Sequence, residues 1–129
     1  MKTTEDVEKL HKLIGQLGGL HSELSLLAKK SPNDGLNLFK MKLVNKVVQG
    51  ANELLSGGYL PFDDFRQFSE DALPTNSDVT LILTQYMEQV ERFRSDHVRF
   101  HVNQWCYVIN GVPSDVEARP PTKVGARRE

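Results

Sequence analysis

The chain has 129 residues, of which 39% are apolar and 26% charged, the balance of an ordinary soluble globular domain. With 16 basic and 17 acidic residues the formal net charge is −1, so nucleic acid is an unlikely partner. The single cysteine, Cys106, excludes an intrachain disulfide framework and a metal site built from several cysteines of one chain. The sequence also lacks a membrane span and the apolar core of a secretory signal, so we expect a cytoplasmic protein with no membrane contact.

The first predicted helix begins after Thr3 and ends near Lys30. Thr3 and Asp6 have the spacing of a capping box. Leucines then recur at alternating steps of three and four residues, the period of an amphipathic helix: Leu10, Leu13, Leu17, Leu20, Leu24 and Leu27. Glycines interrupt the helix away from this stripe, at Gly15, Gly18 and Gly19. These glycines have three possible interpretations. They produce a kink or a short break near Gly18, they form a face of small residues that another helix approaches closely, or they have no structural role and the helix tolerates them.

A second helix is predicted over residues 36–55, after a turn in which Ser31 is the expected N-cap and Pro32 the first helical residue. A connector of about twenty residues follows, which is too long to be structureless in a compact domain. Within it, residues 61–68 predict a short helix, with a proline in its first turn and phenylalanines on one side. We expect this aromatic side to close the end of the bundle, with a ligand-lining role as the alternative.

The longest predicted element is a third helix over residues 77–110, introduced by Thr75 and Asp78 and ended by Asn110-Gly111. Its stripe alternates steps of four and three residues: Val79, Leu83, Tyr86, Val90, Phe93, His97, Phe100 and Gln104. Every second residue from 105 to 109 is aromatic or β-branched, which also suits a strand, but we favour a helix over residues 104–110.

The sequence therefore predicts an all-α fold. Three helices form an antiparallel bundle over residues 1–111, and a flexible or extended C-terminal tail covers residues 112–129.

Signatures of enzymatic chemistry are missing from the sequence. It contains neither a glycine-rich phosphate loop nor a GxSxG nucleophile motif, so we expect a protein without catalytic activity or a cofactor. The weak candidates for a metal site are His21, His97 and His101, since the last two are four residues apart and His21 is expected at the same level of the bundle. A polar histidine layer that fixes helix register is the alternative, and so are exposed histidines.

The long helix is expected to extend past its neighbours by about two turns. This overhang carries large apolar residues, which we predict to form an interaction surface: Phe100, Trp105, Tyr107 and Ile109. The favoured function is a non-enzymatic interaction or regulatory protein that forms a homodimer or binds a protein partner. The alternative is a metal- or ligand-binding bundle around the three histidines. A third possibility is weak nucleic-acid association through basic residues, at Arg92, Arg94, Arg99, Arg119, Lys123, Arg127 and Arg128.

Overall fold

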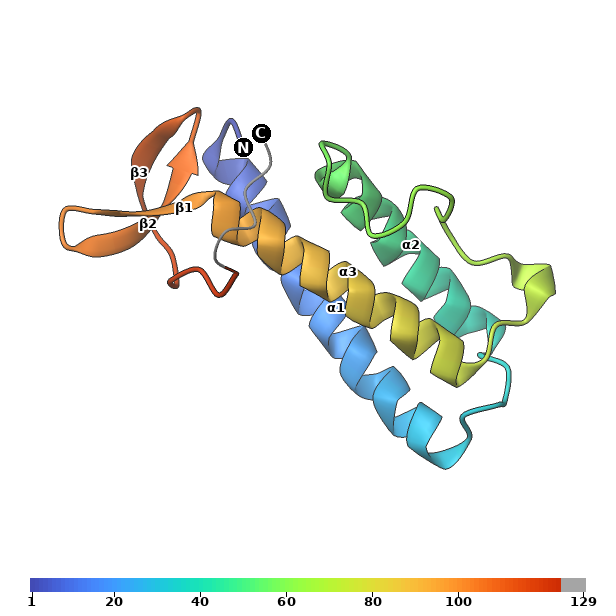
Figure 1. Cartoon of the computed structure of the whole chain (residues 1–129). Coiled ribbons are helices and arrows are strands. Elements are labelled where there is room, and N and C mark those ends of the chain that lie inside the picture. The colour runs from blue at the N-terminus through green and yellow to red at the C-terminus, as the bar shows by residue number, and fades with distance from the viewer. Residues whose placement is uncertain (124–129) are drawn as a thin grey trace.

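The computed structural model describes residues 1–123 and shows three helices followed by a small antiparallel sheet (Figure 1). The helices are α1 (Thr4–Lys30), α2 (Leu38–Leu55) and α3 (Asn76–Asp96), with a short 3-10 helix, η1 (Glu70–Ala72), before α3. The strands are β1 (Val98–His101), β2 (Gln104–Ile109) and β3 (Val112–Glu117), in the spatial order β1-β2-β3. The fold is therefore α+β, and the predicted all-α fold is wrong. Within the described residues, no helix is long and apolar enough to cross a membrane.

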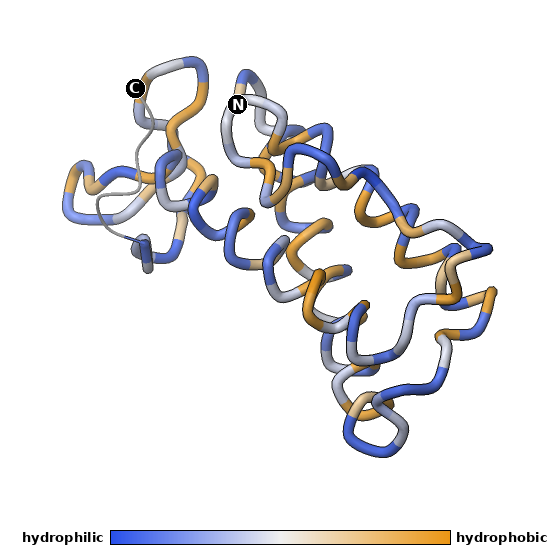
Figure 2. Tube along the Cα trace, turned by 45° about the vertical axis from the view of Figure 1, so that its right-hand side comes forward, coloured by the Kyte–Doolittle hydropathy of each residue, from blue (hydrophilic) through white to orange (hydrophobic). Residues whose placement is uncertain are grey.

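The helices pack in an up-down-up arrangement, with α1 and α3 side by side (Figure 1). Hydrophobic positions recur along each helix (Figure 2). The predicted stripes are confirmed as the core, since their residues are almost fully buried: Leu10, Leu17, Leu24, Val44, Val48, Val79, Leu83, Tyr86 and Val90. Each such side chain contributes about 1.5–3 kcal/mol by leaving water.

Helix α1 begins with the predicted capping box, in which the Thr3 hydroxyl accepts from the Asp6 amide and the Asp6 carboxylate accepts from the Thr3 amide. The helix then runs without a break through its three glycines. In the described part of the chain, no neighbouring group lies within 4 Å of the place a Cβ would take at these glycines. A break near Gly18 and a close helix approach are both wrong, while a kink near Gly18 stays a prediction.

The start of α2 and the connector after it differ from the predictions. Asn37 is the N-cap of α2, accepting from the Lys40 amide, and so the helix begins later than Pro32. Residues 61–68 form no helix, and side chains of α2 bond their backbone instead. The Asn45 amide exchanges two hydrogen bonds with the Phe68 backbone, and Asn52 donates to the carbonyl of Arg66. The Phe68 amide is therefore not available for a helical bond.

The third helix ends at Asp96, not near residue 110. It starts as predicted, with the Thr75 hydroxyl accepting from the Asp78 amide, and its stripe is confirmed as far as Phe93. Beyond His97 the chain is rich in β-branched and aromatic residues that alternate between two faces, a pattern that fits strands better than a helix. The prediction of one long helix to residue 110 is therefore wrong, and so is the prediction that Phe100 and Gln104 continue its stripe.

Two tight turns join the three strands, and each has two consecutive residues with positive φ, as type I′ hairpin turns require. Val102 and Asn103 have φ of 49° and 63°, and Asn110 and Gly111 have φ of 57° and 80°. Asn-Gly is a strong hairpin signal, so these two residues turn the chain instead of ending a helix. Residues 112–117 are consequently a strand and not part of an extended tail. The proposed domain boundary after residue 111 stays a prediction.

Candidate functional site

Strand pairing divides the predicted interface into a buried part and an exposed part. Because side chains alternate along a strand, Phe100 and Trp105, which are cross-strand partners, share a face with the partners Val98 and Tyr107. Tyr107 is 2% exposed beneath the helices, so it lies in the core. Ile109, on the same face of β2, is half-buried against that core.

The exposed part of this face is a pair of aromatic side chains, Phe100 and Trp105, which we call the sheet tip. Phe100 is 57% exposed, and Trp105 is half-buried against the core. Their ring centroids lie 5.5 Å apart with the planes tilted. The β1–β2 hairpin projects beyond the ends of the helices, and Val102 in its turn is 78% exposed (Figure 1). The β1–β2 hairpin thus exposes the apolar side chains of Phe100 and Val102 to solvent.

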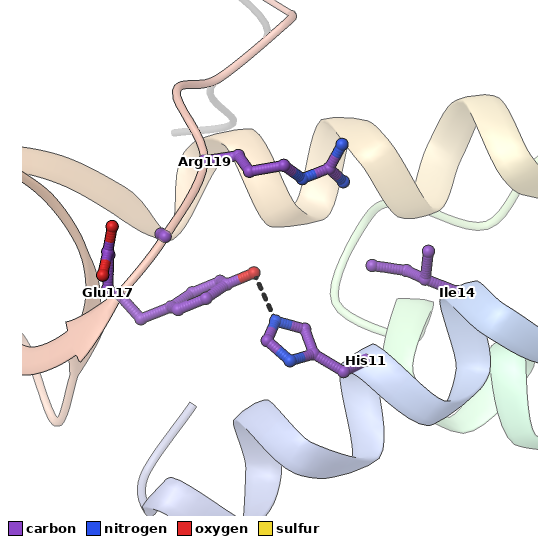
Figure 3. A pocket seen from close by; sticks show the side chains of 6 residues that line it. His11, Ile14, Glu117 and Arg119 are labelled. Atoms are coloured by element: carbon purple, nitrogen blue, oxygen red, sulfur yellow. Dashed lines mark hydrogen bonds between the residues drawn. The ribbon is translucent and has the colours of Figure 1, made fainter.

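A small pocket lies where α1 meets the sheet (Figure 3). Its volume is about 310 Å³, and the Tyr107 hydroxyl and His11 Nε2 form a 2.8 Å hydrogen bond in it. The His11 ring also meets the edge of the Tyr107 ring at a centroid distance of 5.3 Å. Figure 3 shows Arg119 on the side of the pocket opposite His11 and Ile14. The hydrogen bond ties α1 to β2, and the Tyr107 ring belongs to the hydrophobic core.

A buried ion pair on α3 anchors the segment that follows β3. Arg94 is 1% exposed, and its Nε and Nη2 donate to the two carboxylate oxygens of Glu91 at 2.7 and 2.9 Å. It also donates to the carbonyl oxygens of Arg119 and Pro120, at 2.9 and 2.8 Å. Glu91 accepts in turn from the Thr122 hydroxyl at 2.6 Å. Arg94 and Glu91 together therefore clamp residues 119–122 onto the last turns of α3.

The clamp changes the acidity of both partners. Burial raises the pKa of the Glu91 carboxyl, but hydrogen bonds from Arg94 and Thr122 and the charge of Arg94 outweigh burial and bring the pKa down to about 2 from its ordinary 4.5. Hydrogen bonding to Glu91 raises the pKa of the Arg94 guanidinium, against the opposing effect of burial. The pair therefore stays charged throughout the neutral range. Neither residue stands out in sequence, since an i,i+3 Glu-Arg pair on a helix gives no sign of burial.

The three candidate histidines lie at different levels of the molecule. His21 is hydrogen-bonded to the Thr84 hydroxyl at 3.0 Å in the middle of the bundle. His97 stacks on Phe93 at the end of α3, with a centroid distance of 4.1 Å, and His101 is exposed at the end of β1. Thr84 and His97 are 13 positions apart along α3, or about 20 Å by helical rise. Within residues 1–123, no group of three or more potential metal-ligating side chains comes together.

The basic residues considered for nucleic-acid contact are largely engaged in ion pairs. Arg92 bonds Glu88 at 3.0 Å, and Lys123 bonds the other oxygen of Glu88 at 2.8 Å. Arg94 is buried in the clamp, while Arg99 is exposed on β1. Arg127 and Arg128 lie outside the described residues. Arg92, Arg94 and Lys123 thus each have an acidic partner on α3.

Comparisons with protein-family models, with curated proteins and with solved structures find no match to this chain.

Proposed function

We propose that this chain is a non-enzymatic interaction protein that self-associates through the sheet tip. The observation that carries the proposal is the exposure of Phe100 and its aromatic partner Trp105 on a hairpin that extends beyond the helices. Large aromatic side chains supply much of the binding energy at protein interfaces. A two-fold dimer covers the same patch on both copies at once, which is the simplest arrangement for one chain.

Packing of the sheet tips face to face is favoured over pairing of the β1 edges. The Val108 amide donates to the carbonyl of His97, so alternation along β1 leaves the backbone groups of Val98 and Phe100 pointing outward. A two-fold pairing that uses both residues places Arg99 directly opposite Arg99 of the second copy. Like charges in that position are destabilising, as at protected sheet edges. The aromatic face carries no such penalty.

Sedimentation equilibrium over a concentration series tests this proposal. The patch is smaller than a standard interface, so we expect a weak dimer with a dissociation constant on the order of 10–100 µM. Phe100→Glu should abolish the dimer. Leu81→Glu is the matched control, because the exposed fraction of Leu81 is 60%, similar to the 57% of Phe100, but Leu81 lies on α3 and not on the sheet tip. Phe100 is a better position than Trp105, whose substitution would also disturb the core.

A wild-type protein that stays monomeric through the whole series would refute self-association. Equal loss of the dimer in both glutamate variants would show that the sheet tip is not the contact.

The proposal places the protein in the cytoplasm, where the free and buried Cys106 would remain a thiol.

A further inference from the structure

A groove lies between the first half of α1 and the last turns of α2. Its volume is about 810 Å³, within the range of small-molecule sites. Its apolar lining comes from all three helices and includes Leu13 of α1, Leu54 of α2 and Phe93 of α3. Leu13 and Phe93 are 7% and 8% exposed, so they form the floor, while Leu54 is half-buried at the side. The groove is therefore open to solvent above a continuous apolar floor.

Two glycines leave space in this groove, one within α2 and one just after its end. Gly50 and Gly57 both line it, and in the described part of the chain nothing lies within 4 Å of where a Cβ would stand at either position. Gly50 is in the interior of α2, where glycine costs about 1 kcal/mol relative to alanine. No helix packing requires the missing side chain, so the space beside Gly50 is available to another molecule.

One wall of the groove is cationic. Lys9 and Lys12 line it from α1 and are three residues apart, on the same side of the helix. Neither lysine forms an ion pair with another described residue. Two acids also line the groove, but the Asp6 carboxylate accepts from the amides of Lys2 and Thr3 at the helix N-terminus. Glu53 is on the opposite wall, in α2.

We infer that this groove binds a single-chain amphiphile with an anionic head group. The apolar chain would lie over Leu13 and Phe93 beside Gly50, and the head group would meet the ammonium groups of Lys9 and Lys12. Burial of the chain supplies the binding energy, at about 0.8 kcal/mol for each methylene removed from water. The lysines supply the preference for a negative head group. This site is separate from the sheet tip, since neither Phe100 nor Trp105 lines it.

Titration of the full-length, ¹⁵N-labelled protein with dodecanoate below its micellar concentration tests the inference. We expect saturable binding at one site, with shifts of the Gly50 and Gly57 amide resonances. Gly50→Leu fills the groove and should weaken binding at least about tenfold, as loss of the buried chain requires. Gly15→Leu is the matched control, because Gly15 is an exposed helical glycine with the same open surroundings but does not line the groove. This control should bind like the wild type.

Head-group selectivity is tested with dodecanol and dodecyltrimethylammonium under the same conditions. Dodecanoate should bind several-fold more tightly than either, and the double variant Lys9→Gln/Lys12→Gln should remove that advantage without weakening dodecanol. The two lysines are exposed, so the double variant keeps its fold and remains informative if Gly50→Leu proves unstable. Absence of saturable binding, equal binding of the cationic amphiphile, or full retention of affinity in a folded Gly50→Leu protein would each overturn the inference.

Discussion

The Arg94 guanidinium and the Glu91 carboxylate form a two-point ion pair on α3, with bonds of 2.7 and 2.9 Å, and this pair holds the chain that follows the sheet. Arg94 donates to two backbone carbonyls of that segment, while Glu91 accepts from Thr122. The sheet is thus attached to the helices at both ends, directly through His97 after α3 and again through the clamp after β3.

Arg94→Met should destabilise the protein by about 3 kcal/mol, because it leaves the Glu91 carboxylate and two carbonyls without their donor in a buried place. The measurement is urea unfolding followed by circular dichroism. Arg92→Met is the matched control on the same helix, since the Arg92–Glu88 pair is 35% and 34% exposed and should cost less than about 1 kcal/mol. Equal costs for the two substitutions would contradict the assigned role of Arg94.

Stability should fall in acid through the protonation of Glu91. Its pKa is about 2 in the folded protein and ordinarily 4.5, so between these values the unfolded chain binds a proton that the folded one does not. The contribution of Glu91 is therefore complete above pH 4.5 and is lost as the pH falls through about 2. After allowance for solvent at this partly exposed side chain, we expect a loss on the order of 1–2 kcal/mol.

Urea unfolding of the wild type and of Glu91→Gln at a series of pH values between 2 and 7 measures this effect. The variant should be less stable at neutral pH, and its stability should fall less between pH 4.5 and 2. Parallel pH profiles for the two proteins would show that another carboxylate is responsible.

Tyr107→Phe should cost about 1 kcal/mol, because it removes the hydroxyl that bonds His11 and keeps the buried ring. Tyr107→Ala should cost about 3–5 kcal/mol, since it leaves a large cavity between α1 and the sheet. Thermal unfolding distinguishes the two. Tyr107→Phe should also leave self-association unchanged, and a change in the dimerisation constant would restore Tyr107 to the interface.

Leu83→Ala should destabilise the protein by about 2–5 kcal/mol, because Leu83 is fully buried between the helices. Leu81→Ala, two residues away on the same helix, should change stability by less than about 0.5 kcal/mol, because Leu81 is 60% exposed. Differential scanning calorimetry measures both. Similar losses of stability for the two substitutions would contradict the assignment of Leu83 to the core and of Leu81 to the solvent-facing side of α3.

The candidate site was partly predictable from sequence. The large apolar residues after α3 were expected to meet another surface, and two of them, Phe100 and Trp105, are exposed or half-exposed in the structure. The others are covered by the molecule itself, with Tyr107 in the core. The groove beside α2 could not be predicted, because the sequence does not show whether the space around a helical glycine such as Gly50 is open or filled by a neighbouring element.

The sequence alone determined where α1 and α3 begin and which of their faces are buried, because each carries its own local information: the Thr3 and Thr75 caps and stripes at a period of 3.6 residues. It did not decide where α3 ends. Steps of three and four residues lead from Phe93 through His97 to Phe100, while the alternation of a strand begins over the same residues, so both periods fit this short stretch. Tertiary structure settles it: Tyr107 is buried against α1 only if the chain turns back, and the buried Arg94 holds the returning segment. Contacts between residues so far apart in the chain leave no periodic trace in the sequence.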